Sequence, residues 1–339
     1  MFIVVNIIPT GIGAQIGGFA GDSNPVNTLL EEISDIVVTN PNSVNAASLF
    51  SATKKTFYTE GYALDLFLSG KIFLKRKYNK IGIIIDKKAV SKKVHIINAI
   101  NACKSVFGAY IKDIDITDKE VNAKVIKNHK NLFDGLIENK EELLKSANRL
   151  ISKGCNAIAV FCVIENDYYN DDELYLNGKS PDPIGRIEAI ISHYIVENTG
   201  LPSAHAPIFL EDYEKKIVDP RVAAEEIGYT YIPCVIRGLQ HAPQYLKYYE
   251  NNSISIDDVS CIIVPYNCFN GNWIKFLKRK DIPIIMVENN KTILDDKPLE
   301  NLNIIKASNY LESIGIISCI KSGIDYKSVI RPFYSNISF

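Results

Sequence analysis

The chain has 339 residues, of which 47% are hydrophobic and 23% charged, and this composition supports a sizeable hydrophobic core. Its 38 Lys and Arg against 39 Asp and Glu give a net charge of −1, without the basic excess that neutralises a phosphate backbone. No apolar stretch approaches the roughly 20 residues that span a bilayer, and the apolar start lacks the features of a secretory signal. We therefore expect a cytoplasmic protein with neither nucleic acid nor a membrane as partner, and leave formation of a homo-oligomer open.

The cysteines and histidines favour no metal site. The seven cysteines form no CxxC pair and mostly lie in apolar patterns, so we expect reduced thiols: Cys103, Cys155, Cys162, Cys234, Cys261, Cys268 and Cys319. The five histidines show neither H-x-H nor H-x-x-x-H spacing. We predict no cofactor, and a divalent metal has no support in the spacing.

Apolar β-rich runs alternate along the chain with segments of helical periodicity. The first run, FIVVNII, is followed by a glycine-rich segment and then by the helical pattern NPVNTLLEEIS, which has an early Pro. Strands are expected at 2–8, 35–39, 80–86, 110–117, 156–164, 259–265, 282–288 and 303–308. Helices are expected at 24–34, 43–50, 91–108, 140–154, 184–200, 222–230, 271–280 and 309–323. This alternation predicts a doubly wound α/β fold: mostly parallel sheets with helices on both faces and long loops at the carboxyl ends of the strands.

Two stretches interrupt this alternation, at residues 122–139 and 165–183, and both are predicted to be long loops. The second is rich in Tyr, Asp and Asn, and we expect it to act as a lid that closes with Tyr168, Tyr169, Leu174 and Tyr175. We treat residues 1–339 as a single unit. The alternative is a weak division near residue 140, into 1–140 and 141–339.

The segment after the first strand contains five glycines between Gly11 and Gly21. It lacks the Gly-Lys-Ser/Thr of a P-loop, and its G-x-G-x-x-x-G spacing disfavours nicotinamide binding. We predict that its backbone N–H groups bind the carboxylate or phosphate of a small anionic metabolite. The alternative is that the glycines only allow close packing against the sheet. The residues expected to bind are Thr10, Gly11, Gly13, Gly17, Gly18 and Asp22.

Further binding residues are expected beyond the carboxyl ends of other strands, where open parallel sheets bind their ligands. Asn40 and Asn42 follow the second strand, and Asn267 follows the run VSCIIVP. Asp182 and Arg186 fall at the start of helix 184–200, where Arg186 is able to clamp a carboxylate with two hydrogen bonds.

Five residues are candidates for the chemistry. His205 lies in the turn PSAHAP, and His193 is placed at the end of the helical run IGRIEAIISH. Glu165 and Glu288 each follow a strand, and either Glu165 or Asp167 is expected to lie within hydrogen-bond reach of an imidazole. Cys268 precedes a predicted helix, whose dipole would stabilise a thiolate nucleophile; the alternative is a small buried residue.

Several stretches together resemble the family called domain of unknown function 3326. They are PTGIGAQIGGFAGD, NPNSVNAA, EGYALD, ISHYIV, PSAHAP, AAEEIGYTYIPCVIRGLQHAPQY, VEN and NYLESIG. The resemblance covers nearly the whole chain, from Pro9 to about Arg331. It implies one full-length unit and carries no activity with it.

We therefore predict an enzyme that acts by proton transfer on a carboxylated or phosphorylated metabolite, as a lyase, isomerase or hydrolase. The alternative is a binding module for a nucleotide or another anionic metabolite, without turnover. A purely structural protein would leave the polar residues at the strand ends unexplained.

Overall fold

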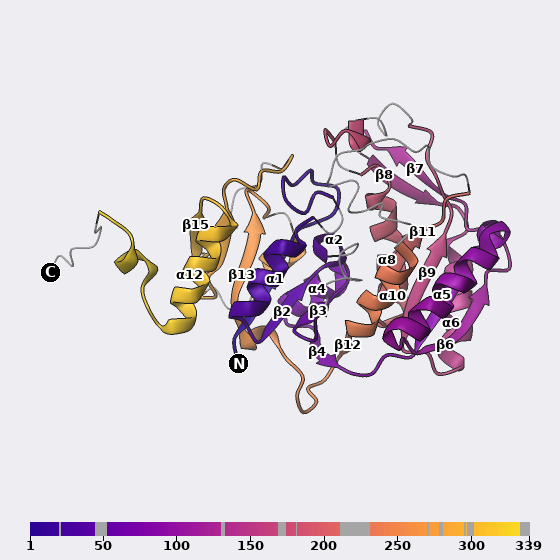
Figure 1. Cartoon of the computed structure of the whole chain (residues 1–339), viewed down its shortest axis with the longest axis horizontal. Helices are drawn as coiled ribbons and strands as arrows, with labels where there is room; N and C mark the ends of the chain where they lie inside the picture. Colours follow the sequence, from indigo (N-terminus) through magenta and orange to yellow (C-terminus); the bar gives the residue numbers. More distant parts are fainter. Residues whose placement is uncertain are drawn as a thin grey trace.

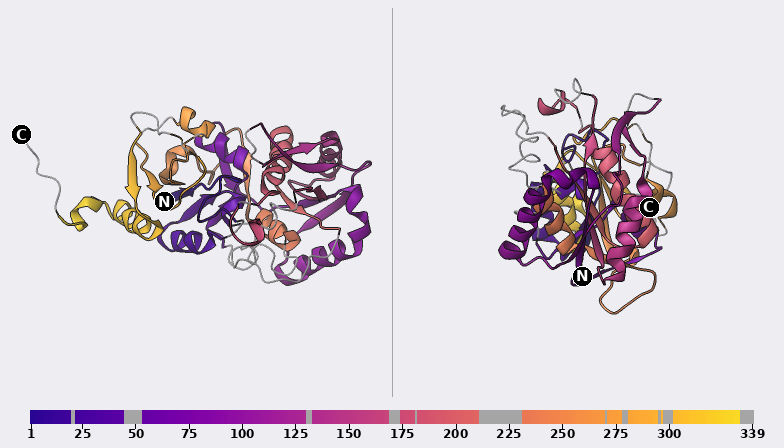
Figure 2. Two further views of the ribbon diagram at one scale, coloured as in Figure 1. Left: turned by 90° about the horizontal axis from the view of Figure 1, so that it is seen from above. Right: turned by 90° about the vertical axis from the view of Figure 1, so that its right-hand side faces the viewer.

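The computed structural model describes residues 1–19, 22–44, 53–129, 133–168, 174–180, 182–210, 231–269, 271–277, 281–294, 296 and 302–332. Its main features are two parallel sheets that lie side by side (Figures 1 and 2). Helices cover both faces of each sheet, so the predicted α/β class is confirmed.

The first sheet, sheet A, contains strands from both ends of the chain. Its order is β15-β14-β13-β1-β2-β3, and every neighbouring pair is parallel. The strands are β1 Ile3–Asn6, β2 Ile36–Thr39, β3 Thr56–Tyr58, β13 Val259–Pro265, β14 Ile284–Val287 and β15 Ile304–Ala307. The order reverses between β1 and β13, and such a switch point opens a crevice at the carboxyl ends of the strands.

The second sheet, sheet C, comes from the middle of the chain and is also parallel, in the order β11-β9-β5-β6. Its strands are β5 Ile81–Ile85, β6 Ile111–Ile116, β9 Ala157–Cys162 and β11 Ser203–Pro207. Every residue of β5 and β9 is buried, as expected for parallel strands covered on both faces. A boundary near residue 140 would separate strands that share this sheet.

Each of the longer helices packs on a sheet through its apolar face. On sheet A, α1 (Asn24–Ile33) and α12 (Tyr310–Ser322) pack on one face, and α4 (Gly61–Leu68) and α11 (Asn272–Phe276) lie on the other. On sheet C, α5 (Lys93–Phe107) and α10 (Tyr231–His241) face α6 (Lys140–Ser152) and α8 (Gly185–Thr199) across the sheet. The shorter helices are α2 Pro41–Val44, η1 Lys87–Lys92, η3 Ile256–Asp258 and η4 Tyr326–Val329.

The connection between the two sheets is a short antiparallel pair, β4 (Phe73–Arg76) with β12 (Pro243–Leu246). The chain leaves sheet A after β3, crosses through β4 to sheet C and returns through β12. Gln244 and Asn79 hold this crossing, because the Gln244 amide donates to Asn79 Oδ1 at 2.8 Å and Asn79 donates to the carbonyls of Leu239 and Ala242.

The predicted loop at 122–139 is wrong for most of its length. Its residues form the hairpin of β7 (Ala123–Lys127) and β8 (Phe133–Ile137), and β10 (Ile164–Glu165) adds to β7. Ala123 and Val125 are buried while the lysines between and after them are not, which is a period-two pattern hidden by the polar composition. The predicted helix at 222–230 lies outside the described residues.

Candidate functional site

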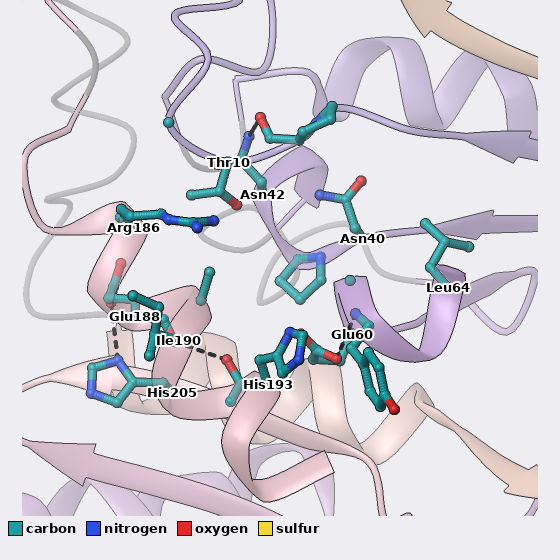
Figure 3. Close-up of a pocket in the computed structure, with 18 of the residues that line it drawn as sticks. Thr10, Asn40, Asn42, Glu60, Leu64, Arg186, Glu188, Ile190, His193 and His205 are labelled. Atoms are coloured by element: carbon teal, nitrogen blue, oxygen red, sulfur yellow. Dashed lines mark hydrogen bonds and ion pairs between the residues drawn. The ribbon is translucent and has the colours of Figure 1, made fainter. Parts of the chain in front are cut away.

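A cavity of about 750 Å³ lies between sheet A and helix α8. On one side, the loops that follow β1, β2, β3 and β13 line it, so it occupies the carboxyl edge of sheet A next to the switch point. On the other side it is lined by α8, by the end of β8 and by β11. The predicted site residues that line it are Thr10, Gly11, Gly18, Asn40, Asn42, Asp182, Arg186, His193, His205 and Cys268. Figure 3 shows most of them around the central space.

Asparagine side chains hold the glycine-rich loop in place. Asn40 accepts a hydrogen bond from the Ile8 N–H at 3.0 Å and donates to the Ile8 carbonyl at 2.8 Å. Asn42 donates to the Gly17 carbonyl at 2.6 Å, and Asn290 makes two bonds of 2.9 Å with the backbone of Ile16. These residues therefore shape the loop that lines the cavity.

The glycines of this loop do not share one role. A Cβ on Gly17 would lie 2.5 Å from Ile8 Cδ1, so this site is closed by packing. A Cβ on Gly13 would lie 3.3 Å from Ile293 Cγ2, a tight contact that a small shift would relieve, and Gly13 is needed chiefly for its φ of +61°. Gly11 has a φ of +73° and its nearest neighbour would be Arg186 Cβ at 4.0 Å. The packing alternative thus accounts for Gly17, while Gly11 brings backbone beside Arg186.

Helix α8 begins where the glycine-rich loop touches it. A Cβ on Gly185 would lie 3.2 Å from Thr10 Cγ2, and Asp182 accepts a hydrogen bond from the Ile184 N–H at 2.9 Å. Arg186 lies in the first turn, as predicted, with its Nε 3.5 Å from Asp134 Oδ1 and about half of its side chain exposed. A helix N-terminus, an arginine and bare backbone together favour an anion at this end of the cavity.

Glu188 and His205 form a pair in the cavity wall, with Glu188 Oε1 3.3 Å from His205 Nδ1. The His205 side chain is 1% exposed and that of Glu188 is 18% exposed. Burial lowers the pKa of His205 and raises that of Glu188, so the pair favours neutral histidine and a carboxyl that keeps its proton. Both residues line the cavity, and Glu188 is the more exposed of the two, so the surroundings favour His205 as its buried partner more than as the general base we predicted.

Glu60 is a second carboxyl in the cavity, and sequence reasoning missed it. It follows the three-residue strand β3 and caps α4, since its Oε2 accepts hydrogen bonds from the N–H groups of Tyr62 at 2.8 Å and Ala63 at 3.3 Å. Burial raises the pKa of Glu60 to about 7 and that of its neighbour Asp65 to about 6. The signal in the sequence was the acidic residue directly before a helical pattern, but the strand ahead of it was too short to recognise.

The pKa of Glu60 predicts how stability depends on pH. Between about pH 4.5 and 7 the folded chain holds a proton on Glu60 that the unfolded chain has released. This contribution to stability is complete below the unfolded pKa and is lost as pH rises through 7. In the wild type, release of this proton should make the free energy of unfolding fall by up to about 1.4 kcal/mol per pH unit between pH 5 and 7. Urea unfolding of Glu60→Gln over the same pH range should lack this part of the fall. Glu250→Gln, which changes an exposed carboxylate paired with Lys75, should keep the wild-type slope; equal slopes for all three proteins would contradict this account.

His193 lies in the middle of α8, which continues to Thr199, so the prediction that it ends a helix is wrong. Its ring packs on Tyr62, with 4.5 Å between the ring centroids. Partial burial lowers the pKa of His193, and the charge of Arg186 acts in the same direction. No helix C-terminus is available to stabilise the imidazolium, and at neutral pH the ring is a neutral part of the cavity wall.

Cys268 reaches the cavity but is not the activated thiolate we expected. Its side chain is buried, and burial raises its pKa to about 12. The helix that follows, α11, has only five residues. The surroundings favour the thiol, which corresponds to the alternative of a small buried residue.

The remaining predicted residues lie away from the cavity lining. Glu165 is exposed and forms an ion pair with Lys88, while the carboxylate beside His205 is Glu188; Glu288 lies 3.8 Å from Lys306 Nζ. Asp22 accepts a hydrogen bond from the Gly17 N–H at 2.6 Å, and Asn267 adopts a φ of +52° in the turn after β13. Glu288 follows β14 as predicted, whereas Glu165 is itself the last residue of β10, and each carboxylate has a lysine partner.

The segment predicted to be a lid touches the glycine-rich loop. Tyr175 stacks on Phe19 with 5.6 Å between ring centroids, and Leu176 joins the same small buried cluster. Leu174 is exposed, and Tyr168 packs against Phe133 of β8. Tyr169 lies outside the described residues. Closure of this segment stays a prediction.

Comparisons with known proteins place the chain in a family. The model of a protein family of unknown function, DUF3326, matches residues 3–330. The chain belongs to this family. It is 34% identical over 331 residues to an uncharacterized lipoprotein of Synechococcus, an alignment that covers 95% of this chain and 91% of the relative. No solved structure matches the chain significantly.

None of the helices within the described residues is long and apolar enough to cross a bilayer. Within the same ranges, no group of three or more His, Cys, Asp and Glu side chains is placed to hold a metal ion.

Proposed function

We propose that this protein is an enzyme that binds a small anionic metabolite in the cavity and moves a proton to or from it. The observation that carries this proposal is that two carboxyls line one cavity, the buried Glu60 and the partly buried Glu188, and that burial raises the pKa of each. A carboxyl that titrates near neutral pH is suited to give and take protons, and such shifts cluster at catalytic sites.

The anionic part of the metabolite is assigned to the opposite end of the cavity. Arg186, the backbone at Thr10 and Gly11 and the start of α8 meet there. A carboxylate or phosphate held by these groups would leave the rest of the molecule facing the carboxyls. The cytoplasmic location of this protein stays a prediction. The word lipoprotein belongs to the name of the Synechococcus relative.

A binding protein without turnover is the second candidate. It is favoured by the position of the cavity between sheet A and helix α8. Sheet A comes from the two ends of the chain and α8 from its middle part, and the pair of β4 and β12 connects these parts. Two bodies joined by short crossing strands are typical of proteins that close around a ligand.

One experiment separates the two candidates. The protein is incubated in D₂O with a pool of small carboxylates and phosphate esters, and mass spectrometry finds compounds that gain a deuteron on carbon, while thermal unfolding finds compounds that bind. An enzyme should exchange a compound that also stabilises it. Stabilisation without exchange would favour the binding protein, and a pool that does neither would contradict both.

Arg186→Ala supplies the matched test of the anion end. Loss of a charge-assisted hydrogen bond, worth about 1.5 to 3 kcal/mol, should weaken binding of the compound about 10- to 100-fold. Lys153→Ala is the control, because Lys153 is about as exposed as Arg186 and pairs with Asp113 away from the cavity. Equal affinities of the two variants would count against the anion end.

A further inference from the structure

We propose that the metabolite carries a protonated amine as well as its anionic group, so that its class is that of α-amino acids and amino-substituted phosphate esters. This inference rests on the proposed function, because it assigns the second end of the same cavity. It starts from the way that charged and polar groups are divided over the cavity.

The polar groups of the cavity fall on two sides, as Figure 3 shows. Thr10, Asn42 and Arg186 lie on one side of the central space, and Glu188, His193 and Glu60 lie on the other. Glu60 and Glu188 come from different halves of the fold. Burial raises the pKa of Tyr58, and the charges of nearby groups, which include Glu188 and Glu60, raise it further. Both carboxyls therefore lie within electrostatic range of this one buried side chain.

Within the residues that the structure describes, the acidic side has no cation of its own. Glu60 and Asp65 form no ion pair within the part of the chain that the structure describes, and the one ionic partner of Glu188 there is His205, which burial keeps neutral. The described lysine and arginine that line the cavity lie away from these carboxyls: Arg186 is on the opposite side, 3.5 Å from Asp134, and Lys140 lies over the ring of Tyr194 at 5.5 Å from its centroid. Three partly desolvated carboxyls without a cation are costly unless they stay protonated or meet a positive ligand.

An ammonium group matches this side of the cavity. It offers three hydrogen-bond donors, and three carboxyls line the cavity as acceptors: Glu60, which caps α4, Asp65, within α4, and Glu188, on α8. Tyr62, which lines the same wall, adds an aromatic ring suited to contact a cation. The groups placed together do not form a metal-binding set in the described ranges, so a monovalent organic cation fits better.

Matched pairs of probes test the inference directly. The pairs are aspartate and succinate, glutamate and glutarate, and 2-aminoethyl phosphate and ethyl phosphate. Calorimetry at pH 7 should show that in at least one pair the amino compound binds ten times more tightly or better. Its binding should also release protons, because an adjacent cation ionises the carboxyls. The release is measured as a dependence of the binding enthalpy on the ionisation enthalpy of the buffer. The compound without the amine should release none.

Variants assign this preference to the acidic side. Glu60→Gln keeps an oxygen to cap α4 and should reduce the preference for the amino compound about tenfold, and Asp65→Asn should act in the same direction. Arg186→Ala should weaken both members of a pair alike. Glu250→Gln should leave every affinity unchanged.

The outcomes keep this inference apart from the proposed function. If the compounds without the amine bind as tightly and still depend on Arg186, the inference is wrong while the anion site stands. If the preference for the amine survives both acidic variants, its assignment to Glu60 and Asp65 is wrong. If no member of any pair binds and the exchange experiment also finds no ligand, the proposed function fails as well.

Discussion

Glu188→Gln is expected to slow deuterium exchange of the bound metabolite by at least about 100-fold, with its affinity changed only a few-fold. Glutamine keeps the size of the side chain and its contact with His205 but cannot give or take a proton. The carboxyl is the more exposed group of the Glu188 and His205 pair, and burial raises its pKa. Exchange rates from mass spectrometry and affinities from calorimetry give the two quantities separately.

The control for this variant is Glu197→Gln, on the same helix. Glu197 also lines the cavity but is exposed. It should keep at least half of the wild-type exchange rate. Removing the partner by His205→Asn should instead move the pH profile of exchange, because the buried imidazole helps to set the proton affinity of Glu188. Unchanged exchange in Glu188→Gln would contradict proton transfer by this carboxyl.

Gly17→Val is expected to lower the free energy of unfolding by about 3 kcal/mol or more. The backbone of Gly17 has a φ of +82°, which a β-branched residue hardly adopts, and its Cβ would lie 2.5 Å from Ile8 Cδ1. The backbone strain costs about 1 to 2 kcal/mol and the overpacking about 1 to 3 kcal/mol. Urea unfolding followed by circular dichroism measures the change.

Gly11→Ala separates packing from ligand contact in the same loop. Its φ of +73° makes alanine strained, but the nearest atom to the new Cβ would be Arg186 Cβ at 4.0 Å. We expect a loss of only about 1 kcal/mol in stability, together with weaker binding of the anion. A Gly17→Val protein as stable as the Gly11→Ala protein would show that the contact with Ile8 is not decisive.

Local patterns were enough for the fold class. The runs that became β1, β5, β9 and β13 are continuously apolar because both faces of a parallel sheet are covered, and this feature is visible in any short window of the sequence. The hairpin of β7 and β8 was missed because it lacks this feature. One of its faces is open, so polar residues dominate the window and the alternation is weak.

The candidate site was predictable only where it depends on position along the chain. Thr10, Gly11, Asn40 and Arg186 follow strands or begin a helix, and residues in these places gather at one edge of a parallel sheet. Glu165 and Glu288 satisfy the same rule yet pair with surface lysines. The rule gives the edge of the sheet and does not give the direction of a side chain.

The sequence by itself determined the alternation of strands and helices, the glycine-rich loop after β1 and the polar ends of the strands, because each depends on neighbours within one element. Only the tertiary structure decided which carboxyls line the cavity. Glu60 and Glu188 lie 128 positions apart, and they line one cavity because the chain inserts sheet C between β4 and β12. Their proton affinities follow from burial, and burial exists only once the two halves pack against each other.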